Sequence, residues 1–335
     1  MRRRQLLPCL AAAAVAGCRT SARQPRKLRL GLIPRFTLAP VYLADELGFF
    51  READLRVEMH AFPEALQLLP ALAGGQIEVS FGTVGAGFIN AVLKGARVRI
   101  VAGRDIAVPG CTTGGAIFGH RKSFPNGLRD LRTLKGKRVA VSQLVGLPAF
   151  YLDQLLASAG MTRADVRTVV MRYPEAAAAV TAGKIDAMVA SQLDKDLDFT
   201  SANVVRSIAL AEILPNFQFT FITFGPALLD GDPETGVRFL WCYLRGVEEY
   251  RAGKTPRALE ELARAFRTDP AAARAACREG ISADGRIDRL SVQRFVDWAV
   301  KNGHVRQAVD ASQLTDTRFV EEACRRLSRP AGASK

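Results

Sequence analysis

Three short loops carry the residues that could recognise a small molecule. One places Arg35 beside Phe36, the second is GTVG at 82–85, and the third is SQLVG at 142–146. An arginine can pair with an anion, and a phenylalanine ring can stack on an apolar or aromatic group. Serine, threonine and glutamine side chains add neutral hydrogen-bonding groups. These residue types are suited to holding a polar or anionic ligand.

Residues for metal or nucleophilic chemistry are sparse. The three histidines, His60, His120 and His304, are far apart, and no two cysteines have a CxxC spacing. A metal site needs several such ligands close together. His60 alternates with apolar residues, which favours a structural histidine on a strand. GTVG matches neither common phosphate-binding glycine motif. The sequence therefore predicts no metal, cofactor or catalytic residue.

The overall charge does not indicate a nucleic-acid-binding protein. The 335-residue chain has a net charge of +14, but its 47 basic residues are spread along the sequence among 33 acidic ones. A nucleic-acid site needs a basic patch or stripe. The length and the 48% hydrophobic content are sufficient for the cores of two domains.

The N-terminus predicts export. MRRRQLLPCLAAAAVAGC combines a basic start, an apolar run too short to span a bilayer, and small residues before Cys18. VAGC resembles the lipobox of bacterial lipoproteins, which implies a signal peptide at 1–17 and lipidation of Cys18. A cleaved signal without a lipid remains an alternative, and a loose twin-arginine match leaves the export route open. Export permits disulfides among the later cysteines, although the sequence does not pair them.

Strand and helix patterns alternate from residue 28 onward. Short β-prone runs at 28–33, 55–62, 76–81 and 98–103 are separated by helical patterns. This order is typical of βαβ units with a parallel sheet, and so of an α/β fold. The three loops above each follow a predicted strand and precede a helix. In such sheets the ligand lies beyond the carboxyl ends of the strands, where helix starts present free N–H groups.

The same unit occurs a second time. LRVEMHAFPEA at 55–65 aligns without a gap to VRTVVMRYPEA at 166–176, and upstream Pro40 faces Pro148. A repeat of this kind predicts one supersecondary plan built twice, with a crevice between two similar lobes. Chance similarity between generic βαβ sequences is the alternative.

Several short motifs carry a family resemblance. They are GFF at 48–50 after the first predicted helix, GQIEV at 75–79, and LKGKRV at 134–139. With the sequence around them, they resemble the substrate-binding proteins of the nitrate, sulfonate, taurine and thiamine-pyrimidine ABC importers. The resemblance covers nearly the whole chain after the signal.

The resemblance implies an α/β, type II periplasmic-binding-protein fold, in which two α/β lobes joined by a hinge enclose a central ligand cleft. Lobe 1 would comprise 28–104 and 225–330, and lobe 2 would comprise 119–220. Hinge segments would lie at 105–118 and 219–224. The C-terminal helices would brace lobe 1, with Trp241 and Trp298 in packing roles.

The resemblance and the strand ends together give a set of candidate ligand contacts. For Arg35 the alternative is a solvated surface charge, and for Arg104 it is a salt bridge between lobes. The candidates are Arg35, Phe36, Gly82, Thr83, Val84, Arg104, Ser142, Gln143, Val145, Gly146, Ser191 and Gln192.

The function implied is that of the solute-binding component of an ABC importer. It would be a monomer in the periplasm or cell envelope, held to the membrane by its lipid, that passes a ligand to permease and ATPase subunits. The apolar loops favour a sulfonate, an aromatic acid or a pyrimidine-like compound. An enzyme on the same fold, of the pyrimidine-synthase or menaquinone-pathway lyase type, and a sensor subunit are the alternatives.

Overall fold

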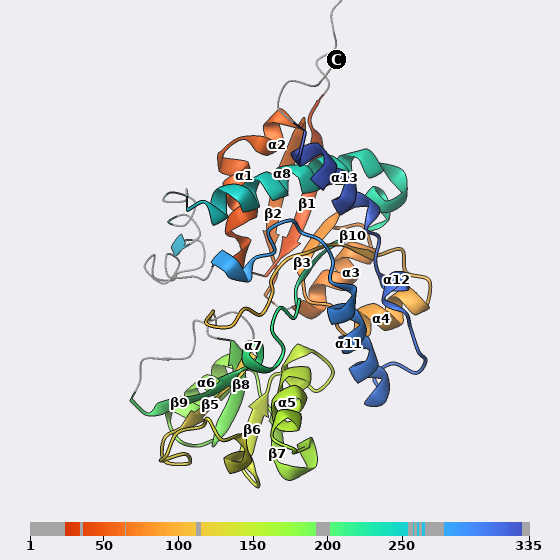
Figure 1. Cartoon of the computed structure of the whole chain (residues 1–335). Helices are drawn as coiled ribbons and strands as arrows, with labels where there is room; N and C mark the ends of the chain where they lie inside the picture. Colours follow the sequence, from red (N-terminus) through yellow and green to blue (C-terminus); the bar gives the residue numbers. More distant parts are fainter. Residues whose placement is uncertain are drawn as a thin grey trace, which may run out of the picture.

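Two five-stranded sheets form the centres of two lobes stacked end to end (Figure 1). The computed structural model describes residues 24–33, 36–63, 65–111, 115–191, 202–253, 257, 260, 263–264 and 278–329. The lobe 1 sheet has the order β2-β1-β3-β10-β4, and the lobe 2 sheet has the order β7-β6-β8-β5-β9.

The strands of lobe 1 are β1 (Arg26–Leu32), β2 (Leu55–Ala61), β3 (Val79–Gly82), β4 (Arg99–Gly103) and β10 (Phe221–Phe224). Those of lobe 2 are β5 (Gly115–His120), β6 (Arg138–Val141), β7 (Arg167–Val170), β8 (Ala187–Ser191) and β9 (Val204–Ala209). In each sheet one central strand, β10 or β5, runs antiparallel to both of its neighbours.

The α-helices of the described residues are α1 (Ala39–Glu46), α2 (Phe49–Glu52), α3 (Leu68–Ala73), α4 (Ala86–Leu93), α5 (Leu147–Ser158), α6 (Tyr173–Thr181), α7 (Leu210–Ile213), α8 (Pro233–Arg251), α11 (Arg289–Lys301), α12 (Ala311–Leu314) and α13 (Arg318–Leu327). The longest, α8, begins with Pro233 after Asp232, whose carboxylate accepts the Thr235 N–H at 3.1 Å. Proline in the first turn and an N-cap aspartate both favour this start.

The internal repeat is present in the structure. β1, β2 and β3 occupy the same places in lobe 1 as β6, β7 and β8 in lobe 2. Pro40 and Pro148 both lie in the first turn of the helix after the first strand of their repeat, α1 and α5. The predicted α/β fold with two lobes is therefore confirmed, and the chance-similarity alternative is wrong.

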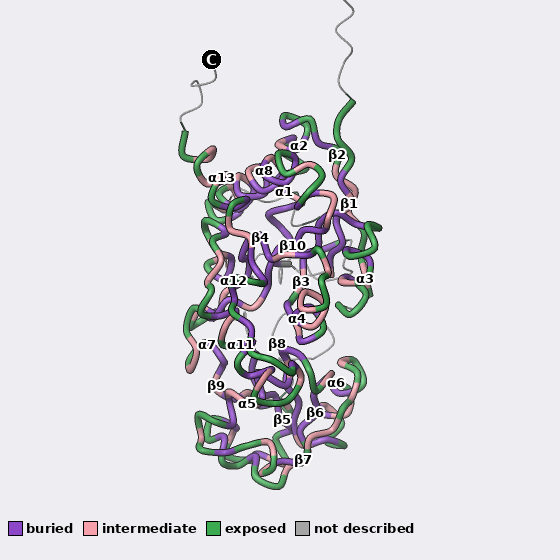
Figure 2. The backbone as a smooth tube through the Cα atoms, turned by 90° about the vertical axis from the view of Figure 1, so that its right-hand side faces the viewer, coloured by how far each residue is buried: buried purple, intermediate pink, exposed green. Residues whose placement is uncertain are grey.

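Buried residues run through the strands of both sheets, and exposed residues lie on the outer helices and turns (Figure 2). In lobe 1, α8 covers the core with Phe239, Leu240 and Tyr243, all buried. It packs closely on α1, where a Cβ at Gly246 would overlap the Pro40 carbonyl oxygen. A glycine is therefore required for the two helices to approach this closely.

Two segments connect the lobes side by side. The first leads from β4 to β5 and the second from β9 through α7 to β10. They pair through the Ala107 N–H to the Phe217 carbonyl at 2.9 Å and the Asn216 N–H to the Ala107 carbonyl at 2.7 Å.

The predicted hinge segments, 105–118 and 219–224, extend too far into the sheets. β5 begins at Gly115 and β10 occupies 221–224 as a fully buried central strand. Their apolar residues pack between other strands, so these ends are parts of the lobes. The connections between the sheets are 104–114 and 210–220.

Candidate ligand-binding cleft

The second predicted loop lies at the carboxyl end of β3 in lobe 1. Gly82 is the last residue of β3, Thr83 is exposed, and Val84 is buried. Gly85 is the N-cap of α4 and has an extended backbone, with φ of −116°. Neither glycine has the positive φ of a tight glycine turn, so conformational freedom does not explain them.

The third predicted loop lies at the equivalent place in lobe 2. Ser142 follows β6 and is exposed, as is Val145, while Gly146 is buried and is the N-cap of α5. The Gln143 side chain lies against Gly146, where a Cβ would be 2.6 Å from Gln143 Nε2. A glycine at this position lets the glutamine side chain cover the helix start.

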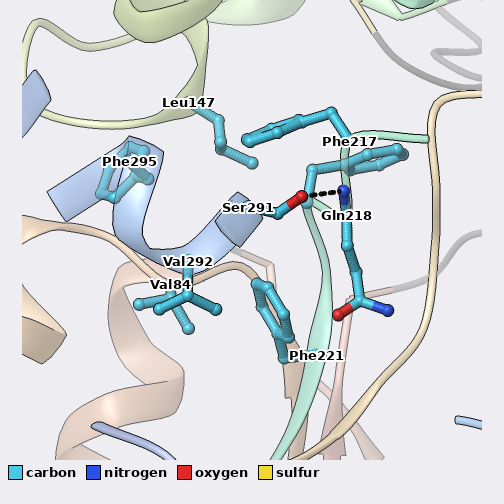
Figure 3. A pocket seen from close by; sticks show the side chains of 9 residues that line it. Val84, Leu147, Phe217, Gln218, Phe221, Ser291, Val292 and Phe295 are labelled. Atoms are coloured by element: carbon cyan, nitrogen blue, oxygen red, sulfur yellow. Dashed lines mark hydrogen bonds between the residues drawn. The ribbon is translucent and has the colours of Figure 1, made fainter. Parts of the chain in front are cut away.

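A narrow apolar pocket of about 10 Å³, enough for about one water molecule, lies where the two loops lead into their helices. Val84 at the start of α4 and Leu147 at the start of α5 both line it (Figure 3). The remaining lining residues come from the second connecting segment, β10 and α11: Phe217, Gln218, Phe219, Phe221, Ser291, Val292 and Phe295. The structure therefore brings the helix starts of both lobes together.

Both helix starts lack a capping side chain. The N-cap residues are Gly85 in α4 and Gly146 in α5, and neither helix has an acidic residue in its first turn. Unpaired N–H groups at a helix start carry partial positive charge and suit an anionic or strongly polar group.

Arg104 is buried, with 3% of its surface exposed. Its guanidinium donates to the Thr37 carbonyl at 3.2 Å and the Thr37 hydroxyl at 3.0 Å, and it lies 5.1 Å from the Phe81 ring centre. The Asp105 carboxylate is 3.4 Å away, within the same connecting segment. In this arrangement Arg104 holds η1 (Phe36–Leu38) in place, and its contact with a ligand stays a prediction.

The first predicted loop and the end of β8 are described only in part. Phe36 begins η1, but its side chain and Arg35 lie outside the described residues. Ser191 is the last residue of β8 and its backbone faces Gly115 of β5; its side chain and Gln192 lie outside the described residues.

The three phenylalanines that line the pocket were not among the predicted ligand contacts. Phe217, Phe219 and Phe221 recur at every second residue, a spacing that puts them on one face of an extended segment. That alternation was a usable signal. No sequence pattern indicated the lining residues of α11, because 291–295 belong to a helix more than 140 positions after Leu147.

The cysteines divide into two groups. Cys111 is disulfide-bonded, whereas Cys242 and Cys324 have free thiols. Burial raises the pKa of the Cys242 thiol to about 12, and its Sγ donates to the Phe49 carbonyl at 3.1 Å. Cys18 and the whole signal lie outside the described residues.

The described residues contain neither a metal-binding cluster nor a membrane-spanning helix. No group of three or more histidine, cysteine, aspartate or glutamate residues in them has the arrangement of a metal site. Among their helices, none combines the length and the apolar character needed to cross a membrane.

The comparison with protein families is decisive. The profile of the NMT1/THI5-like family matches residues 35–253, more than half of the chain. The chain belongs to this family. A curated relative, the nitrate import ATP-binding protein NrtC of Synechococcus elongatus, is 31% identical over 186 residues, which are 52% of this chain. The match spans only 27% of that longer protein.

Solved structures of similar proteins have the same fold. The periplasmic aliphatic sulphonate binding protein SsuA of Escherichia coli superposes with a TM-score of 0.69 at 19% identity, covering 88% of this chain and 92% of SsuA. The periplasmic nitrate-binding protein NrtA of Synechocystis PCC 6803 gives a TM-score of 0.67 at 14% identity, covering 91% of this chain and 90% of NrtA. The predicted periplasmic-binding-protein fold of two α/β lobes is confirmed.

Proposed function

We propose that this protein is the solute-binding component of an ABC importer and that it captures its ligand between the two lobes. The observation that carries the proposal is the meeting of two helix starts, one from each lobe, at the pocket lined by Val84 and Leu147. A ligand held by both starts stabilises one arrangement of the lobes, and a permease can recognise that arrangement. The protein itself performs no chemistry.

The ligand in this proposal is a small organic anion. The uncapped N–H groups of α4 and α5 favour its charged group. Phe217, Phe219 and Phe221 line the apolar side of this narrow pocket, and they would contact an apolar or aromatic part of the ligand once the lobes move apart to admit it. An inorganic ion such as nitrate has no such part, so a sulfonate or an aromatic carboxylate fits this lining better. A pyrimidine-like compound would use the ring contacts alone.

Further contacts would come from the loops around the helix starts. Thr83, Ser142 and Gln143 are exposed or half-buried next to the pocket and offer hydrogen bonds. Arg35 and Phe36 would approach from the loop before η1, and Ser191 and Gln192 from the end of β8. Arg104 would act indirectly, through its hold on Thr37.

The protein would work outside the cytoplasm. SsuA and NrtA are named as periplasmic proteins. The disulfide at Cys111 supports the same compartment for this chain, because disulfides persist in oxidising surroundings. The signal at 1–17 would be removed, and a lipid on Cys18 would hold the protein at the membrane as a monomer.

A thermal unfolding screen tests this function. The protein without residues 1–20 is unfolded with benzenesulfonate, taurine, nitrate, benzoate and a pyrimidine in turn. A ligand at 100 times its Kd adds about 2.7 kcal/mol to the free energy of unfolding, a shift of several degrees at this size. A shift with the sulfonate or the carboxylate supports the proposed class. A shift with nitrate alone contradicts it, and consumption of any compound indicates an enzyme.

A further inference from the structure

The α11 helix is attached to lobe 1 through the backbone on both of its sides. Before the helix, the Gly285 carbonyl accepts the Gly103 N–H of β4 at 2.8 Å. After it, the Asp316 N–H donates to the Ile100 carbonyl of β4 at 2.8 Å. Because the segments before and after α11 are both joined to the edge of the lobe 1 sheet, we infer that α11 moves with lobe 1.

The same helix reaches lobe 2 through its side chains. The Trp298 indole N–H donates to the Asp153 carboxylate of α5 at 2.7 Å. The rings of Phe295 and Trp298 lie 5.6 and 5.7 Å from the ring of Phe150, a fully buried residue of α5. Such aromatic contacts and a partly buried charge-assisted hydrogen bond are strong for their small area.

A second polar contact extends this interface. Arg163, just beyond α5, pairs with Asp153 at 2.7 Å and donates to the Asn302 side chain at 3.0 Å. On the lobe 1 side, the Asn90 amide of α4 donates to the His304 carbonyl at 2.9 Å. The turn after α11 is therefore held by both lobes.

The helix also lies behind both helix starts of the cleft. Val292 and Phe295 of α11 line the same pocket as Val84 and Leu147 (Figure 3). One hydrophobic cluster runs from α4 through α11 to α5 without interruption. The separation of the two helix starts thus depends on how α11 packs.

We propose that α11 is a strap that fixes the angle between the lobes, and that Trp298 and Asp153 are positioning residues for the cleft. Rotation of the lobes about the connecting segments has to break the side-chain contacts to α5 while the backbone contacts to β4 persist. Loosening the strap moves the α4 and α5 starts apart and weakens a ligand that needs both. The effect on ligand affinity rests on the function proposed above; the effect on the lobe angle does not.

The first test needs no ligand. Trp298→Phe removes the indole N–H and keeps a ring, Asp153→Ala removes the acceptor, and Arg294→Ala on the exposed face of α11 is the matched control. The radius of gyration by small-angle scattering and amide exchange at 105–107 and 216–219 are measured for each. Both strap variants should have a larger radius of gyration, and their amides at these positions should exchange about tenfold faster. The control should match wild type in both measurements. Folded variants with wild-type scattering and exchange would overturn the strap.

Titration with benzenesulfonate is the second test. Asp153→Ala should bind it about tenfold more weakly than Arg294→Ala does. Equal or tighter binding by Asp153→Ala would mean that the contact does not hold the binding arrangement, and the positioning role would be wrong. Failure of the wild-type protein to bind benzenesulfonate would count against the ligand class, while the scattering and exchange results would still decide the strap.

Discussion

Glu78 and Asp186 hold equivalent positions in the two lobes and make the same contacts. The Glu78 carboxylate accepts the Arg29 backbone N–H at 2.7 Å, and that of Asp186 accepts the Arg138 N–H at 2.9 Å. Each carboxylate also pairs with the side chain of its arginine. Glu78 directly precedes β3 and Asp186 directly precedes β8. Each pair therefore fixes the start of that strand against its neighbour, at the middle of β1 in lobe 1 and at the start of β6 in lobe 2.

The loss of folding stability at low pH should depend on Asp186. Burial acts to raise its pKa, but hydrogen bonds from Arg138 and Ser123 lower it from 3.8 to about 2. A carboxyl with a lowered pKa contributes stability that is present above 3.8 and lost as the pH falls toward 2. Asp186→Asn should therefore lose about 1 kcal/mol at pH 7, since the site is partly exposed, and less at pH 2.5. Urea unfolding at both pH values measures this.

The comparison for that test is Asp54→Asn, on an exposed turn. A loss for Asp186→Asn that is the same at pH 7 and pH 2.5 would show that the charge of the carboxylate does not contribute.

Gly246→Ala should be strongly destabilising. The added methyl group would overlap the Pro40 carbonyl where α8 packs on α1, and backbone has to move to relieve the contact. Overpacking of this kind costs about 1–3 kcal/mol. Gly87→Ala in α4 is the control, because nothing lies within 4 Å of its added Cβ. It should be neutral or stabilising by up to about 1 kcal/mol. Equal melting temperatures for the two variants would contradict the close packing.

Stability should also fall in mild acid because of His304. Burial and the nearby Arg163 lower the pKa of its imidazole below 6.5, and Asp153 partly opposes this. The unfolded chain then binds the proton more readily, so stability is lost as the pH falls from 6.5 toward the lowered pKa. His304→Phe should show a smaller decrease between pH 7.5 and pH 5 than wild type in urea unfolding. A decrease in His304→Phe as large as that of wild type would show that the His304 imidazole does not cause it.

Arg104 and Thr37 should be energetically coupled. The guanidinium makes two hydrogen bonds to Thr37, and both residues are buried. A double-mutant cycle with Arg104→Gln and Thr37→Val should give a coupling of about 1 kcal/mol in urea unfolding. Additive losses would indicate that Arg104 does not hold η1, and direct contact with a ligand would become the better explanation for this arginine.

Much of the fold could be predicted because it follows from local patterns repeated along the chain. The two βαβ units, Pro40 and Pro148 at their helix starts, and the loops at 82–85 and 142–146 are all properties of short segments. The burial of Arg104 could not be predicted. It depends on Thr37 of η1 and Phe81 of β3, two residues that are distant from it in the sequence.

The contact between Trp298 and Asp153 joins residues 145 positions apart, and no sequence pattern connects them. Their packing depends on how the lobes are placed relative to each other. Amphipathic spacing predicts that α11 buries one face, but it does not say which lobe that face meets.

The pairing of Ala107 with Asn216 and Phe217 makes lobe 2 an insertion with adjoining ends. The chain leaves lobe 1 after Ala107 and returns beside it at Asn216, so we expect lobe 2 to be exchangeable as a single unit. Chimeras that take 108–214 from another family member need only two junctions. Such chimeras would show which lobe determines ligand specificity. Phe150 and Asp153 have to be retained in them, because α11 contacts both.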